Sequence, residues 1–301
     1  MTTMEDTPRI PRPASTVILL REAGRGIEVY LLKRSSNSGF MPGHFVFPGG
    51  MVEEMDLAPA QWGAHIDLSR EEIARRLGGS LDPDEAMGYG IAAIRETFEE
   101  AGILFARHAE GQERGYQGIA QVRTTKGLSE GWLAEIVESQ GWTLTLSRLF
   151  RWSHWITPKE KRQRFDTRFF IAILPRGQAC TPDCVETTTG SWVTPKEALV
   201  GNLEGRMLLS PPTLVTLNEL YQFPTMEALA EEAEKRTWGR PRQPRVVCSS
   251  HRTLILLPWD PMRYEEGEIA VNSLESRVVP IGAPFSRLWN HQGIWKPLDH
   301  P

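Results

Sequence analysis

Cysteine is scarce in this sequence, with only Cys180, Cys184 and Cys248 among 301 residues. An odd set of three does not supply the disulfide framework of a small secreted domain, so a reducing compartment is the simpler interpretation. Cys180 and Cys184 also lack the second pair of ligands that a structural zinc site requires. A chain of this length can bury a sizeable hydrophobic core without covalent cross-links.

Long apolar runs and an excess of positive charge are also missing. The longest apolar run, FFIAIL at 169–174, is much shorter than the roughly 20 residues of a membrane-spanning helix. Residues 1–14 contain no apolar stretch of the kind found in signal peptides, and they predict a flexible N-terminal arm. With 34 Lys and Arg against 38 Asp and Glu, the net charge of −4 argues against nucleic acid as a partner. We therefore expect a globular protein that binds neither a membrane nor nucleic acid.

Strand-forming and helix-forming segments are mixed along the chain. The runs 15–20 and 27–33 flank a glycine-containing turn, which is typical of a β-hairpin. Further strands are expected at 147–157, 167–174, 191–194, 253–260 and 275–282, and further helices at 128–141, 211–222 and 225–236. This mixture predicts an α/β fold.

Capping signals mark several helix ends. Ser69 and Glu72 form the sequence pattern of a capping box. A second helix is expected between Asp82, as its N-cap, and Gly102, where the chain can stop. The motif TPKE occurs twice, at 157–160 and 194–197, and each threonine is predicted to cap a helix that begins at the following proline.

The last part of the second helix carries a cluster of carboxylates. Glu96, Glu99 and Glu100 would share one side of the helix, where like charges repel. A divalent cation such as Mg²⁺ relieves this repulsion, because it prefers carboxylate oxygens and commonly bridges protein to phosphate groups. Such a cluster can hold the metal and activate a water molecule, and Arg95 can hold one carboxylate in a bidentate pair. The alternative is a solvated acidic face.

The peptide FPGGMVE at 47–53, taken together with RETFEEAGI at 95–103, resembles the signature of the Nudix hydrolases. That signature is written G-x5-E-x7-R-E-U-x-E-E-x-G-U, where U is an aliphatic residue. Gly50 and the residues from Arg95 to Ile103 match it, except that Thr97 stands at an aliphatic position. Thirty-eight residues separate Asp56 from Arg95 where the signature has seven. The role of the first glutamate therefore stays open among Glu53, Asp56 and Glu85.

The resemblance implies an α/β/α sandwich with a mixed β-sheet, a helical insert at about 57–82 and a small C-terminal extension. The hydrolase domain would span 15–240, and residues 241–301 would pack on the core or at a homodimer contact. The resemblance also implies that Mg²⁺ or Mn²⁺ is bound by Glu96, Glu99, Glu100 and Gly50, and that Arg95, Glu99 and Glu100 are catalytic. Glu186, six residues before Trp192, has the spacing of a further metal ligand in founding members of the family, or else is a surface loop residue.

Flanking stretches, among them WSHWITP at 152–158 and RFDTRFF at 164–170, resemble the peroxisomal coenzyme A diphosphatase branch of the family. Members of that branch cleave CoA or acyl-CoA into 4′-phosphopantetheine, or its acyl form, and adenosine 3′,5′-bisphosphate. Residues expected to bind such a small-molecule nucleotide are Lys33, Arg34, Arg164, Arg168, Trp152 and Trp155. The alternatives are that the cations are solvated and that a tryptophan belongs to the core.

Other interpretations of the function also stay open. The chain could hydrolyse another nucleoside diphosphate derivative, such as NADH, ADP-ribose or a nucleotide sugar, or it could be a nucleotide sensor without activity. The last residues, PLDHP, are not a peroxisomal targeting signal, so a cytoplasmic location is expected.

Overall fold

The computed structural model describes residues 10–24, 26–39, 41–108, 112–125, 128–248, 253–264 and 277–299. Most of the N-terminal arm predicted at 1–14 lies outside these residues. No helix in the described ranges is long and apolar enough to cross a membrane.

A mixed β-sheet forms the centre of the molecule. Its strands run in the order β3-β2-β1-β8-β7, with β4 paired to β1 and β9 paired to β2. Strands β1 and β8 are parallel, whereas β1 and β2 form the predicted antiparallel hairpin. The strands are β1 (Arg12–Ala23), β2 (Gly26–Arg34), β3 (Phe45–Val46), β4 (Gly49–Met51), β7 (Phe150–Ile156), β8 (Phe165–Ile173) and β9 (Thr187–Val193).

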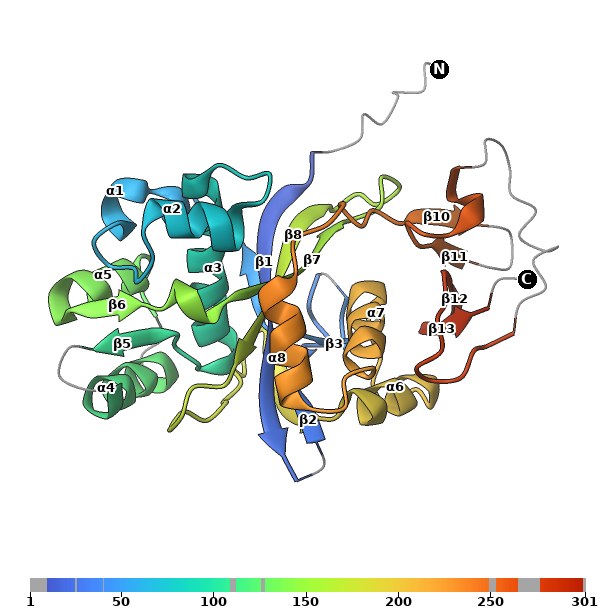
Figure 1. The fold of residues 1–301 in the computed structure, drawn as a ribbon. Coiled ribbons are helices and arrows are strands. Elements are labelled where there is room, and N and C mark those ends of the chain that lie inside the picture. Colours follow the sequence, from blue (N-terminus) through green and yellow to red (C-terminus); the bar gives the residue numbers. More distant parts are fainter. Residues whose placement is uncertain are drawn as a thin grey trace, which may run out of the picture.

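Helices cover both faces of this sheet (Figure 1). Alternation along β1 shows the two faces, because side chains of successive strand residues point to opposite sides. Val17 and Leu19 pack with helix α3 (Pro83–Ala101) in one core cluster, and Ile18 and Leu20 pack in a second cluster. That second cluster contains side chains of α6 (Pro195–Leu203), α7 (Pro211–Leu220) and α8 (Met226–Lys235). The predicted α/β/α sandwich is confirmed.

The stretch before α3 is helical, as predicted. It contains a 3-10 turn η1 (Met55–Leu57), helices α1 (Pro59–Trp62) and α2 (Arg70–Ile73), and a π-helical turn η2 (Ala74–Gly78). Ser69 and Glu72 form the capping box. Asp82 caps α3 by accepting a hydrogen bond from the backbone N–H of Asp84.

A second group of elements packs beside α3, on the side away from α6 and α7 (Figure 1). It consists of β5 (Ala106–His108), α4 (Gln112–Thr125), α5 (Trp132–Gln140), β6 (Trp142–Leu144) and the 3-10 turn η3 (Leu146–Arg148). Strands β5 and β6 pair with each other. Helix α5 falls within the predicted helix 128–141, whereas α4 and the small sheet were not predicted.

The C-terminal residues form a separate antiparallel sheet, in the order β10-β11-β12-β13. Its strands are β10 (Arg245–Cys248), β11 (Thr253–Leu256), β12 (Arg287–His291) and β13 (Ile294–Leu298), and the 3-10 turn η4 (Pro261–Tyr264) follows β11. Ile255 and Leu288 belong to the same core cluster as α7, so this sheet packs on the body of the protein. The strand predicted at 275–282 begins outside the described residues, and its described part contains one bridge, from Val278 to Leu298.

The two TPKE motifs have different structures. Thr194 caps α6 with a full capping box, as predicted. The prediction for Thr157 is wrong: this residue ends the β7–β8 hairpin, where its N–H donates to the carbonyl oxygen of Phe165 and its hydroxyl accepts from the Phe165 N–H. Strand pairing with β8 takes the backbone groups that a helix would need.

Candidate active site

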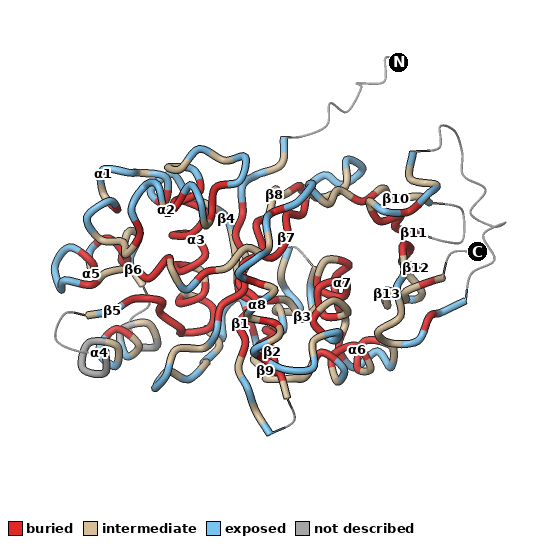
Figure 2. The backbone as a smooth tube through the Cα atoms, viewed as in Figure 1, coloured by how far each residue is buried: buried red, intermediate tan, exposed pale blue. Residues whose placement is uncertain are grey.

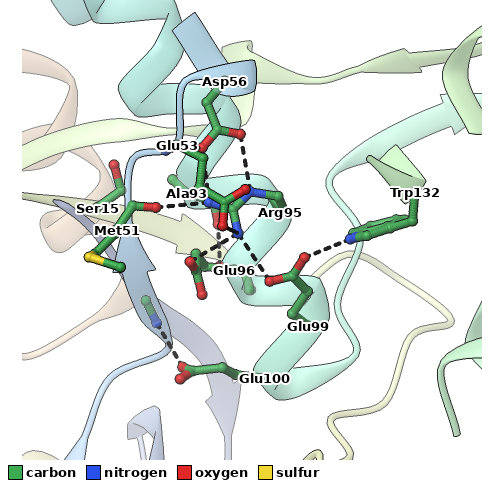
Figure 3. Close-up of polar contacts among 12 residues, drawn as sticks. Ser15, Met51, Glu53, Asp56, Ala93, Arg95, Glu96, Glu99, Glu100 and Trp132 are labelled. Carbon is green, nitrogen blue, oxygen red and sulfur yellow. Dashed lines mark hydrogen bonds and ion pairs between the residues drawn. The ribbon is translucent and has the colours of Figure 1, made fainter. Parts of the chain in front are cut away.

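The three glutamates project from the last two turns of α3 (Figure 3). Most of this helix is buried (Figure 2), and Ile91, Ile94 and Phe98 fix its orientation by packing into the core. Gly102, at φ 75°, ends the helix in the left-handed conformation that glycine adopts without strain. Thr97 replaces an aliphatic residue but is fully buried, because its hydroxyl donates to the Ala93 carbonyl. The glutamates are thus held on a rigid, anchored helix end.

Two glycines of β4 approach the carboxylates closely. The Gly49 N–H donates to Glu100 Oε2 at 2.8 Å. A Cβ atom on Gly50 would lie 2.4 Å from the Glu96 carboxylate, so a larger residue there would occupy the carboxylate's position. A Cβ on Gly49 would lie 2.3 Å from the Ser15 backbone oxygen. Glycine at 49 therefore lets β4 pair closely with β1, and glycine at 50 leaves the space that the Glu96 carboxylate occupies.

Arg95 connects the helix to the segment that follows β4. Its guanidinium donates to both carboxylate oxygens of Asp56, at 3.1 and 2.9 Å, and to the Met51 carbonyl at 2.8 Å. Asp56 is buried and sits in η1. Glu53 lies farther from the guanidinium, at 3.8 Å, and Glu85 is exposed in the first turn of α3. Of the three acids left open by the sequence, Asp56 therefore makes the bidentate contact to Arg95.

The same guanidinium also holds two of the glutamates. Arg95 Nη1 donates to Glu96 Oε1 at 3.0 Å and to Glu99 Oε2 at 3.1 Å. Burial disfavours its charge, but the hydrogen bonds to Asp56 and the carboxylate of Glu96 keep the pKa of Arg95 above its ordinary value. Arg95 therefore stays charged and partly offsets the repulsion among the acids.

Burial raises the pKa of all three glutamates. It raises the pKa of Glu96 to about 7, although the charge of Arg95 opposes this shift. For Glu100 burial acts first and the charge of Glu96 adds to it, so the pKa lies well above the ordinary value. Burial likewise raises the pKa of Glu99 against the Trp132 hydrogen bond. Ionisation of all three glutamates is therefore unfavourable in the protein alone, and a bound cation would favour their charged form.

Trp132 is a site residue that the sequence analysis missed. Its indole N–H donates to Glu99 Oε1 at 2.6 Å, and its ring lies 4.8 Å from that of Phe98. It comes from α5, outside the Nudix signature, and the sequence predicted only a helix at 128–141. A cavity of about 300 Å³ opens here between η1 and α5, lined in part by Asp56, Arg95 and Glu99.

The carboxylates face two directions. Glu99 points toward Trp132, whereas Glu100 points to the opposite side, toward β4 (Figure 3). Within the described residues, no three acidic, histidine or cysteine side chains converge on one point that would hold an ion. Glu96 and Glu100 both contact the β4 glycines, and their oxygen donors fit a hard cation such as Mg²⁺. These two residues could hold the metal, with oxygens of water or substrate completing the coordination.

Arg34 and Glu186 lie close enough to Glu100 for their charges to act on its pKa, which Arg34 lowers and Glu186 raises. The Arg34 guanidinium donates to Ser38 Oγ at 3.1 and 3.0 Å. Lys33 is exposed, with its ammonium 5.8 Å from the Phe45 ring. The fold thus brings Arg34 and Glu186 beside the signature helix from the same end of the β2–β9 pairing, where Arg34 lies opposite Thr187.

Four residues expected to bind substrate are instead buried. Arg168 is 4% exposed and lies between the rings of Tyr89 and Trp238, at 5.6 and 5.2 Å. Arg164 is 7% exposed and donates to the Thr157 carbonyl. Both guanidiniums are thus buried within the fold.

The two tryptophans also require a correction. Trp152 and Trp155 are 1% and 3% exposed and belong to the core cluster of α7 and α8. Trp152 packs against Phe223, and the Arg236 guanidinium covers its ring at 3.5 Å. Neither indole offers a free face on which adenine could stack. A bulge in β7 between Arg151 and Ser153 allows both side chains to enter the same core.

Comparisons with known proteins show the family of this chain. The family model of the NUDT19 Nudix domain matches residues 69–220, which include all of α3. The acyl-coenzyme A diphosphatase NUDT19 of Xenopus laevis is 30% identical over 306 residues, covering 87% of this chain and 80% of that protein. The chain belongs to the NUDT19 branch of the Nudix hydrolases. The human acyl-coenzyme A diphosphatase NUDT19 is 27% identical with the same coverage.

A solved Nudix structure has the same fold. The NUDIX hydrolase from Alicyclobacillus acidocaldarius covers 74% of this chain and 96% of its own, with a TM-score of 0.59 and 24% identity. This likeness concerns the fold alone. The predicted family and the predicted enzyme class, a Nudix hydrolase, are both confirmed.

Proposed function

We propose that this Nudix hydrolase cleaves the diphosphate linkage of coenzyme A or acyl-CoA. The observation that carries the proposal is the pair of Glu100, which is buried, and Glu96, which is half-buried: they lie against Gly49 and Gly50, and burial raises the pKa of both. Relatives at 27–31% identity are named acyl-coenzyme A diphosphatases, which supports CoA or acyl-CoA as the substrate. The products would be 4′-phosphopantetheine, or its acyl form, and adenosine 3′,5′-bisphosphate.

Glu96 and Glu100 would hold the cation, for which Mg²⁺ or Mn²⁺ is expected. When bound, a divalent cation neutralises the diphosphate oxygens and favours attack at phosphorus. Water supplies the attacking oxygen, the bond between one phosphorus and the bridging oxygen breaks, and each product carries a terminal phosphate. A glutamate of the cluster accepts the water proton.

Glu99 is the best-positioned candidate for that base. Arg95 and Trp132 fix its carboxylate from two sides, so its orientation does not depend on the cation. Arg34 would contact the phosphates, because it is half-buried near Glu100 and an arginine suits bidentate phosphate recognition. Glu186 would approach the same region as a further ligand.

The catalytic domain is proposed to span residues 15–240, with 241–301 as an extension that packs on it. Contacts between the two parts support this packing. The Asn202 side chain of α6 donates to the Trp295 carbonyl of β13 at 2.8 Å. Leu288 of β12 shares a core cluster with Leu214 of α7. The extension would therefore stabilise the layer of α6 and α7 without reaching the glutamates.

A substrate panel with Mg²⁺ or Mn²⁺, read by mass spectrometry, tests the proposal. We expect kcat/KM to be highest for CoA or an acyl-CoA, compared with NADH, ADP-ribose and a nucleotide sugar. A preference for NADH, ADP-ribose or the nucleotide sugar would agree with Nudix chemistry but would reject CoA and acyl-CoA as the substrates. Tight binding without any turnover would indicate a nucleotide sensor.

A further inference from the structure

A second pocket, of about 340 Å³, lies where the insert, strand β7 and helix α8 meet. Four arginines, one glutamate and three apolar residues line this pocket. The lining residues are Arg75, Arg76, Leu149, Phe150, Arg151, Ala233, Glu234 and Arg236. We refer to it as the arginine pocket.

This pocket is separate from the glutamate cluster. Leu149, which lines the pocket, and Leu77, which follows Arg76, approach the position of a Cβ on Gly90, in the first half of α3. Ten residues of helix separate Gly90 from Glu100, which corresponds to about 15 Å along the axis. An anion in the arginine pocket would therefore not touch a metal held by Glu96 and Glu100.

Two of the arginines are fixed by contacts within the protein. Arg76 Nη2 donates to the Ser147 carbonyl at 2.7 Å. Arg236 stacks on Trp152 and pairs with Glu232 at 2.9 Å and with Glu219 at 3.5 Å. Arg236 therefore already has acidic partners. Arg76 has none among the described residues, and its contact to Ser147 leaves other N–H donors of the fork for a ligand.

The other two arginines lack close acidic partners. Arg151 is half-buried on β7, and its guanidinium has no hydrogen bond or ion pair in the described part of the chain. Burial lowers its pKa, so its charge is costly where it stands. Arg75 is exposed, and its only ion pair in the described ranges is with Glu72, at 3.9 Å. Although the net charge of the chain is −4, three arginines with few acidic partners, Arg75, Arg76 and Arg151, surround the arginine pocket.

We propose that the arginine pocket binds a small anion that carries a phosphate group. Guanidinium forks match phosphate oxygens with two parallel hydrogen bonds, and several of them suit a group with more than one negative charge. The concave shape favours a small anion over an extended acidic surface. Glu234 is exposed at the wall, where water screens its repulsion.

Titration calorimetry with inorganic pyrophosphate tests this site directly. The protein is kept in EDTA, because without a divalent cation the acidic active site repels the same anion. We expect saturable binding to one site, weakened at least about 10-fold in the double variant Arg75→Gln/Arg151→Gln. These two arginines are chosen because their loss removes no hydrogen bond within the described protein.

Four further measurements make the result specific. Arg148→Gln removes one positive charge from an exposed arginine outside the pocket and should leave the affinity unchanged. Glu100→Gln should also retain binding, and the double variant should retain hydrolysis, so the outcome does not depend on the proposed function. Competition by adenosine 3′,5′-bisphosphate and by inorganic phosphate distinguishes a phosphate ester from free phosphate as the occupant.

Clear outcomes would overturn the proposal. The proposal fails if pyrophosphate binding is not saturable, or if the double variant binds as tightly as the unaltered protein. It also fails if Arg148→Gln weakens binding as much as the double variant does. Each result would show that the arginines are only a solvated cationic surface. Thermal unfolding of each variant confirms that the fold is intact.

Discussion

Glu96 links the stability of the metal-free protein to pH. Burial raises its pKa from 4.5 to about 7 in the folded protein. Because the folded-state pKa is the higher one, the folded protein binds the proton more tightly than the unfolded chain. The stabilisation is therefore complete below pH 4.5 and is lost as the pH rises through 7. At about 1.4 kcal/mol per pKa unit, Glu96 alone accounts for roughly 3 kcal/mol.

Thermal unfolding in EDTA between pH 5 and pH 8 measures this effect. A loss of roughly 3 kcal/mol corresponds to a fall in Tm of about 6–12 °C for a chain of this size class. The variant Glu96→Gln cannot ionise, so its Tm should fall less over the same range, and the difference between the two proteins isolates the contribution of Glu96. Glu100, whose pKa is raised in the same direction, adds to the total slope.

Mg²⁺ should reverse the loss. A cation binds the ionised carboxylates, so it should raise Tm more at pH 8 than at pH 5, and it should do little for Glu96→Gln. If the Tm of Glu96→Gln follows that of the unaltered protein at every pH, the pKa of Glu96 is not raised by burial. The case for a metal ion at Glu96 then fails.

Three substitutions test the roles of individual residues. Glu100→Gln should lower kcat/KM at least about 100-fold and leave the fold intact, because it removes a metal ligand while the Gly49 N–H keeps its acceptor; near-normal turnover would reject the assignment. Trp132→Phe keeps the ring but removes the hydrogen bond to Glu99, so we expect kcat to fall about 10-fold with little change in KM. A change in KM alone would show that Trp132 only lines the cavity. Gly50→Ala should displace the Glu96 carboxylate and weaken the activating effect of Mg²⁺ roughly 10-fold, which a metal titration of activity measures. An unchanged titration would mean that Glu96 does not contribute to the metal site.

Local signals in the sequence predicted the elements that carry the chemistry. Asp82, Pro83 and Gly102 define the ends of α3 by backbone chemistry that needs no tertiary partner, and the structure has the helix between them. The hairpin of β1 and β2 and the capping box at Ser69 follow for the same reason. The position of the signature residues at the end of α3 was therefore predictable, but not that Glu99 and Glu100 turn to opposite sides.

Contacts between distant segments could not be predicted in this way. Thr157 and Thr194 begin the same four-residue motif, yet pairing with β8 overrides the cap at Thr157. Trp132 reaches Glu99 only because α5 packs beside α3, which no local pattern specifies. Trp152 enters the core because of a bulge in β7, and a strand pattern does not reveal a bulge.

We propose that the glutamates of α3 serve metal-dependent cleavage of a CoA diphosphate. The most direct test is the release of adenosine 3′,5′-bisphosphate from CoA, followed by mass spectrometry with Mg²⁺, with EDTA, and with the Glu100→Gln variant. We expect the bisphosphate to form only with the unaltered protein and Mg²⁺. Its formation at the same rate in EDTA, or its absence under all three conditions, would contradict this role of the glutamates.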